Sequence, residues 1–226
     1  MAYYTTTIKP VLTASRQAAA AYADEDVLFD WTEVTLPVRG SLKLKTVTFV
    51  VRGTDGSRQE FGMDLLFSTS NAASMGAQNA TASLPPSNSI IGNWKVIVQQ
   101  YGDGLDRFSV GGSNSAYDGF VIPGQSSGKI YIGGICDGTP DFRSTVQVST
   151  ETATNTTAVV VKTTDARQTF AVGDVLADED DQAIGTIKTI TDATNLVLEE
   201  NCASVSAVNK DLYNTSPITI ILGFEK

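Results

Sequence analysis

The sequence predicts an all-β protein, with a β-sandwich or jelly-roll-like main domain and a second, small β-barrel domain. Three observations lead to this prediction. Short runs alternate apolar and polar residues, as in strands that bury one face. Residues that favour turns lie between these runs. Charged residues make up only 18% of the chain, against about 25% in an average soluble protein.

The N-terminal segment 1–24 is the one part that does not follow this pattern. Residues 11–24 are rich in alanine and contain few β-branched residues. Alanine has the highest helix propensity and loses no side-chain entropy in a helix. We therefore expect an N-terminal arm or a short helix before the β domains.

The main domain is expected to span residues 25–156, joined by residues 214–226. From Gly40 onwards, Leu42 and Leu44 alternate with lysines, and a second apolar series then begins at Val47. The alternation slips by one residue near Lys45 and Thr46. Such a slip is what a β-bulge produces, because one extra residue reverses the face on which every later side chain lies.

The pair Asp55-Gly56 lies between two strand-like runs and predicts a hairpin, because it favours the positive φ angles of a tight turn. The second run carries apolar residues at alternate positions, from Phe61 to Phe67. Residues 68–89 follow, rich in Ser, Asn, Ala, Gly and Pro. A segment of that length without periodicity predicts a functional loop or a contact surface.

The small barrel is expected over residues 157–213, where about five short strands occur at the close spacing typical of small β units. Residues 217–222 form one more strand-like run beyond it. One economical arrangement makes 157–213 an insertion. The last strand then returns to the main domain and pairs beside Val146 and Val148.

Composition excludes or disfavours several functions. The chain has no histidine, which removes the commonest general base and zinc ligand, and its net charge of −9 disfavours nucleic-acid binding. We expect no catalytic residue, cofactor or metal, although a pair of carboxylates could in principle act in hydrolysis. Cys136 and Cys202 are expected to be buried thiols. We see no signal peptide and no membrane-spanning run.

Charge is unevenly distributed along the chain. Residues 171–201 contain eight acidic side chains against Lys188, whereas residues 39–58 contain five basic side chains against Asp55. The acidic run from Asp178 to Asp181 could bind Ca²⁺, but it lacks EF-hand spacing, and a solvated hairpin tip explains it as well. Opposite patches can orient subunits, or they can be ordinary solvated faces. The residues expected to contact a partner are Tyr3, Tyr4, Arg16, Arg39, Lys43 and Lys45.

Two sets of motifs resemble proteins of tailed-phage particles. Phe170-x-Val-Gly-Asp-Val-Leu176 and Asn195-Leu-Val-Leu198 resemble a small β module repeated in phage virion proteins. Arg52-Gly-Thr-Asp-Gly56 and Asp64-Leu-Leu-Phe-Ser68 resemble structural proteins of marine and cyanobacterial phages. The resemblance implies a virion structural protein without enzymatic activity.

Within that class, we expect a capsid decoration or cement protein that binds the major capsid protein lattice, with homo-oligomerisation as a further option. It would be made in the host cytoplasm and lie on the capsid surface, with no nucleic acid or membrane as partner. The alternative is a tail- or fibre-associated module that recognises a host surface polymer. A glycan hydrolase or lyase is a third reading, which requires two facing acids in a cleft.

Overall fold

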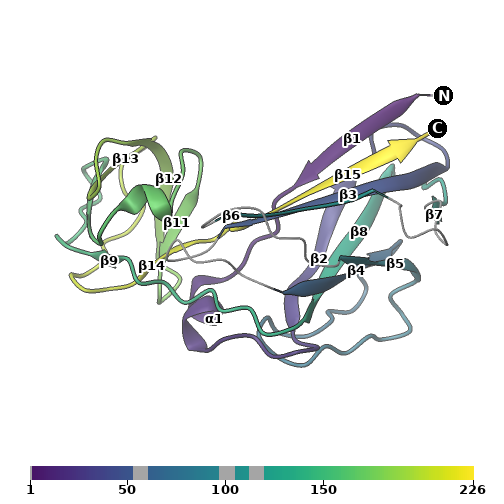
Figure 1. Cartoon of the computed structure of the whole chain (residues 1–226), viewed down its shortest axis with the longest axis horizontal. Helices are drawn as coiled ribbons and strands as arrows, with labels where there is room; N and C mark the ends of the chain where they lie inside the picture. Colours follow the sequence, from purple (N-terminus) through teal and green to yellow (C-terminus); the bar gives the residue numbers. More distant parts are fainter. Residues whose placement is uncertain (1, 53–60, 97–104, 112–119) are drawn as a thin grey trace.

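The structure is a computed structural model that describes residues 2–52, 61–96, 105–111 and 120–226. Its described part is almost entirely β, in the form of a two-sheet sandwich and a small near-barrel (Figure 1). This confirms the expected fold class. The sandwich occupies one end of the molecule and the barrel the other, and both termini lie at the far end of the sandwich.

One sheet of the sandwich has the order β1-β15-β3-β6, and β7 also pairs with β3. All these pairings are antiparallel. The strands are β1 (Tyr3–Ile8), β3 (Leu42–Arg52), β6 (Leu105–Gly111), β7 (Phe120–Ile122) and β15 (Ile218–Glu225).

The second sheet of the sandwich has the order β2-β8-β4-β5. Its strands are β2 (Val27–Thr35), β4 (Gly62–Ser68), β5 (Ile90–Val96) and β8 (Lys129–Asp137). The main core lies between the two sheets. Phe49 of β3 packs edge-to-face against Phe61, which precedes β4, with ring centroids 5.9 Å apart.

The predicted bulge is confirmed. Leu44 pairs with Phe224 and Thr46 with Gly223, so Lys45 is the extra residue on β3. Both apolar series, before and after it, are therefore buried: Leu42 and Leu44 face the same core as Val47.

The predicted hairpin is wrong. The turn at Asp55-Gly56 lies outside the described residues, but the strands on either side of it, β3 and β4, belong to different sheets. β3 pairs with β15 and β6, and β4 pairs with β5 and β8. β3 and β4 thus lie in opposite layers, and each buries an apolar face in the core that the two sheets share. In a hairpin, the two strands would instead lie side by side in one sheet.

The second sheet is buried on both faces. Leu66 points away from the main core and packs with Val27 and Met75 in a separate cluster. Gly133 in β8 makes this possible, because a Cβ there would lie 2.3 Å from the methyl group of Met75. The glycine pair 133–134 thus lies inside a strand and allows close packing on each face, rather than forming a turn.

The small near-barrel has the strand order β14-β11-β12-β13-β10-β9. A bridge between Gln147 and Asp211 joins β9 to the residue before β14, so the sheet curls back on itself. Its strands are β9 (Gln147–Val148), β10 (Ala158–Lys162), β11 (Val175–Asp178), β12 (Ala183–Ile190), β13 (Asn195–Leu198) and β14 (Leu212–Asn214), with a 3₁₀ turn η1 (Ala166–Gln168).

The expected pairing of the last strand is wrong. β15 lies between β1 and β3, whereas Val148 pairs with Val161 in the barrel. Val146 and Val148 are fully buried in the barrel core. Each of these strands therefore pairs at the position where its apolar side chains are buried in a core.

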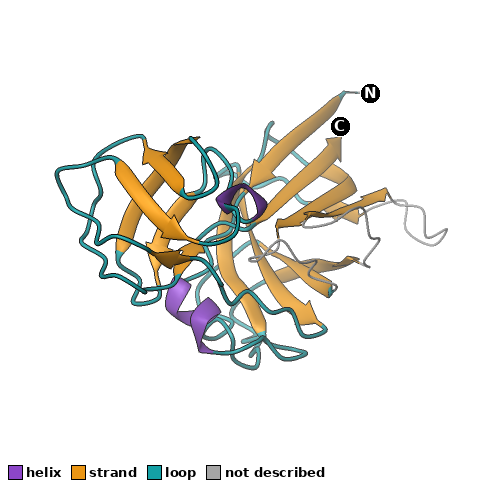
Figure 2. Ribbon diagram, turned by 60° about the vertical axis from the view of Figure 1, so that its left-hand side comes forward, coloured by secondary structure: helices purple, strands orange, loops and turns teal. Residues whose placement is uncertain are grey.

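The N-terminal segment contains both a strand and a helix. β1 occupies its beginning, and α1 (Ala14–Ala19) follows within the Ala-rich stretch. α1 packs against β11 and β14 of the barrel (Figure 2). No helix in the described ranges is long and apolar enough to cross a membrane.

Candidate functional site

Five of the six residues expected to contact a partner gather at the far end of the sandwich. Tyr3 pairs with Glu225, and Glu225 pairs in turn with Lys43 on β3. The Lys45 ammonium lies 3.6 Å from the Glu225 carboxylate. Strands β1 and β3, on either side of β15, therefore bring aromatic and basic side chains to the same end of the sheet, although they lie about 40 residues apart in the chain.

Arg39 joins this end through the C-terminus. The Lys226 ammonium donates a hydrogen bond of 3.0 Å to the Arg39 carbonyl, and the Lys226 backbone pairs with Ala2. Arg39 precedes β3, whereas Lys43 and Lys45 lie on that strand. We name the set Tyr3, Arg39, Lys43 and Lys45 the terminal surface. Tyr4 lies at the same end, but its side chain packs against the main core.

A shallow groove of about 380 Å³ runs across part of the terminal surface. Gly223 of β15 forms part of its floor, and the Thr46 side chain packs over this glycine. The Tyr3 side chain is 70% exposed and lines one side of it. The groove is lined by Tyr3, Tyr4, Thr5, Lys45, Thr46, Gly223 and Phe224.

Arg16 does not belong to the terminal surface. It lies on α1, which contacts the barrel at the other end of the sandwich. Its carbonyl accepts a hydrogen bond of 3.1 Å from the Asn79 side chain. The six residues therefore do not form one contact surface, because β1 runs from the terminal end towards the barrel and α1 follows it there.

The loop 68–89 is tied to its own domain on one side. The Asn88 side chain accepts from Ala73, and Trp31 donates a hydrogen bond of 3.0 Å to the Ala73 carbonyl. Gln78 binds the backbone of both Val11 and Thr13. The loop thus covers the second sheet and holds the segment before α1, so its contact role stays a prediction for the exposed part.

The acidic turn after β11 is held by the fold rather than open to an ion. Asp178 is buried and accepts hydrogen bonds from Asp180, Gln182 and Ser206. Lys210 lies 2.7 Å from Glu179, and its hydrogen bonds to Asp180 and Glu179 raise its pKa. Within the described ranges, no group of three or more Asp, Glu, Cys or His side chains could hold a metal ion.

The junction between sandwich and barrel carries a nearly buried ion pair. Arg52, at the end of β3, donates two hydrogen bonds of 2.6 Å to Asp174. The Asp174 side chain is only 2% exposed. Burial raises the pKa of Asp174, and the Arg52 charge opposes this shift. The two hydrogen bonds from one guanidinium to one carboxylate fix the orientation of the barrel relative to the sandwich.

A second junction contact joins α1 to the acidic turn. The Ser15 amide and hydroxyl both donate to Asp181, at 2.9 and 2.5 Å. The buried Gln17 amide donates to the carbonyls of Leu12 and Asn214. Sequence reasoning missed these contacts, because residues separated by more than 100 positions leave no local signal of their pairing.

The remaining buried acidic and thiol groups are also engaged or enclosed. Asp26 accepts a hydrogen bond of 2.8 Å from the Ala23 amide. Cys136 and Cys202 are free and buried, as expected, and burial raises the pKa of both thiols. A high thiol pKa keeps the reactive thiolate scarce.

Comparisons with known proteins do not place this chain in a family. No family model, curated protein or solved structure matches it.

Proposed function

We propose that this chain is a non-catalytic structural protein of a tailed-phage particle, and that it decorates the capsid by binding the major capsid protein lattice. The resemblance of its turn and strand motifs to phage virion proteins suggests the particle. The observation that carries the proposal is the terminal surface, where an exposed tyrosine of β1 and basic side chains on and before β3 lie at one end of an otherwise acidic protein.

The use of acidic side chains supports a structural role. Among the residues whose burial the structure describes, three aspartates are buried, Asp26, Asp174 and Asp178, and each accepts hydrogen bonds from neighbouring groups. Carboxylates used in this way stabilise loops and junctions. A general acid or base would instead have to reach a substrate.

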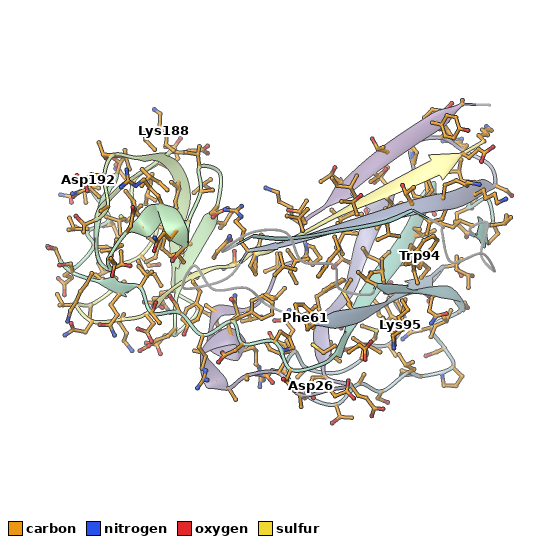
Figure 3. The ribbon with its side chains drawn as sticks, in the orientation of Figure 1. Asp26, Phe61, Trp94, Lys95, Lys188 and Asp192 are labelled. Atoms are coloured by element: carbon orange, nitrogen blue, oxygen red, sulfur yellow. The ribbon has the colours of Figure 1, made fainter. Side chains whose placement is uncertain are left out.

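The charge distribution favours the terminal surface, rather than the barrel, as the end that contacts the partner. Residues 146–213, which contain the barrel, carry eleven acidic and four basic side chains. Asp192 and Lys188 project from the barrel (Figure 3). A partner with an acidic face is attracted to the terminal surface and repelled by the barrel, which orients the protein as it binds.

The test is binding to undecorated capsids assembled from the major capsid protein of the same phage. Co-sedimentation of the protein with capsids should saturate. The temperature of the capsid's thermal transition should rise, because a ligand that binds only the assembled shell stabilises it by mass action. Arg39→Glu should weaken binding by about tenfold, which corresponds to roughly 1.4 kcal/mol, because it reverses a charge that attracts the partner.

Lys188→Glu is the matched control, because it makes the same charge change at an exposed position on the barrel. It should leave binding unchanged. If the folded wild-type protein does not bind capsids, the decoration proposal fails. Binding to intact host cells would then support the tail-associated module that recognises a host surface polymer.

A further inference from the structure

β1 is an edge strand whose outer side is open in the described part of the molecule. It stands last in its sheet, and among the described strands it pairs with β15 alone. Figures 1 and 2 both show it at the margin of the sandwich. An edge strand presents backbone donors and acceptors that can pair with another strand.

The hydrogen-bond pattern identifies the groups on the open side. The backbones of Ala2 and Lys226 exchange bonds of 3.3 and 3.1 Å. Hydrogen-bonded pairs alternate along an antiparallel ladder, so Tyr4, Thr6 and Ile8 also face β15. The N–H and C=O groups of Thr5 and Thr7 therefore point outwards. Both residues are exposed, and no hydrogen bond joins their backbone to another described residue.

This edge lacks the features that usually prevent pairing. Natural edges are protected by charged side chains, proline or bulges. The strand from Tyr3 to Ile8 contains no charge, proline or glycine, and its register with β15 has no shift. Threonine, tyrosine and isoleucine are all enriched in strands. Its sequence favours the addition of a further strand.

We propose that β1 pairs antiparallel with β1 of a second copy of this chain, about a two-fold axis at Thr6. Thr5 then lies opposite Thr7 of the second copy, and the reverse pair completes the ladder. One surface meets itself in such an interface, so the outward groups of Thr5 and Thr7 supply every donor and acceptor it needs. Opposed threonines are also favourable cross-strand neighbours.

Electrostatics favours this partner and this direction. The strand itself is uncharged, so two copies of it do not repel each other. β1 runs along the long axis of the molecule, with the N-terminus far from the barrel (Figure 1). An antiparallel pair therefore places the two acidic barrels at opposite ends of the dimer, where their repulsion is smallest.

The first test is the mass of the full chain in solution, measured by sedimentation equilibrium without capsids. The protein should reach twice its 23.9 kDa as its concentration rises. Thr5→Pro removes an outward N–H without removing a bond to β15, a position where an edge strand tolerates proline. It should weaken dimerisation by about tenfold or more, because two hydrogen bonds per dimer disappear.

Thr5→Val is the control, because it retains the N–H and the branched side chain, and it should dimerise like the wild type. Thermal unfolding verifies that each variant is folded. A wild-type protein that stays monomeric at millimolar concentration overturns the proposal, as does a Thr5→Pro variant that dimerises normally. Neither result bears on capsid binding.

Disulfide trapping tests the register. At the two-fold axis, Thr6 lies opposite itself in a non-hydrogen-bonded pair, where Cα atoms are about 4.5 Å apart, within the range of a disulfide. Thr6→Cys should form a covalent dimer on mild oxidation. Thr5→Cys should form far less, and the buried Cys136 and Cys202 should not contribute. The opposite pattern overturns the two-fold axis at Thr6.

Discussion

The sandwich and the barrel end their sheets in different ways. The barrel sheet curls until β9 meets the segment before β14, through the bridge between Gln147 and Asp211. The sandwich sheet ends openly at β1. Closure removes unpaired edges, whereas an open sheet keeps one available. The two units therefore differ in what they present to a partner. The barrel presents side chains, and the sandwich also presents backbone N–H and C=O groups at β1.

The contact between the two units differs from the packing inside each of them. The two large cores share no residue, and the small cluster between them contains only Ala14, Ala177 and Tyr213, with Ala18 against it. The junction therefore depends on polar contacts, chiefly the Arg52–Asp174 pair and the Ser15–Asp181 bonds. Mutations can separate the contributions of core and junction.

The largest effect is expected from truncating one core at a time. Phe49→Ala in the sandwich should cost about 3 to 5 kcal/mol, and Ile187→Ala in the barrel about 2 to 5 kcal/mol, through lost transfer energy and the cavities left behind. Both side chains are fully buried. Because the cores are separate, each variant should lower the transition of its own unit.

Urea unfolding with two probes measures this difference. Trp31 and Trp94, the only tryptophans of the chain, lie in the sandwich, so fluorescence follows the sandwich while far-UV circular dichroism follows both units. Phe49→Ala should shift the fluorescence transition strongly and Ile187→Ala only weakly. Equal shifts in both variants would show that the units unfold as one.

A smaller effect is expected from breaking the junction. Arg52→Ala leaves Asp174 buried without its cation. The cost at pH 7 should be about 2 kcal/mol, below the roughly 3 to 5 kcal/mol of fully buried pairs, because the Arg52 side chain is 27% exposed. The free energy of unfolding from urea titrations measures it.

The cost of Arg52→Ala should depend on pH. Burial raises the pKa of Asp174 and Arg52 lowers it, so the pKa rises further in the variant. A carboxyl whose pKa is raised in the folded state loses stability as the pH rises through that pKa. The variant should therefore be closest to wild type at acidic pH. Asp174→Asn combined with Arg52→Ala should remove this dependence; a pH-independent cost would contradict the assignment.

The smallest effect is expected at the terminal surface. Lys45→Ala removes an ion pair of 3.6 Å whose members are partly exposed. Such pairs contribute about 0.5 kcal/mol or less to stability. Thermal unfolding should hardly change, whereas a destabilisation near that of Arg52→Ala would mean that Lys45 has a structural role.

Local patterns predicted much of this fold because strand alternation and turn residues act over a few positions. The slip near Lys45 was enough to predict the bulge, since one extra residue moves every later side chain to the other face. The same kind of pattern failed at Asp55-Gly56. Two alternating runs beside a turn signal fit a hairpin and a crossing between sheets equally well, and only the partners of β3 and β4 distinguish them.

The sequence by itself determined the strand-rich class, the small second unit and the excess of acidic residues in the barrel region, because these depend on composition and on short-range periodicity. Only the tertiary structure shows that Tyr3 and Lys43 lie on either side of Glu225, that Arg52 binds Asp174 and that β1 ends its sheet in the described part of the chain. The physical reason is that strand pairing joins residues through backbone groups common to every residue type, so the identity of the partner is set by the core that both strands bury together.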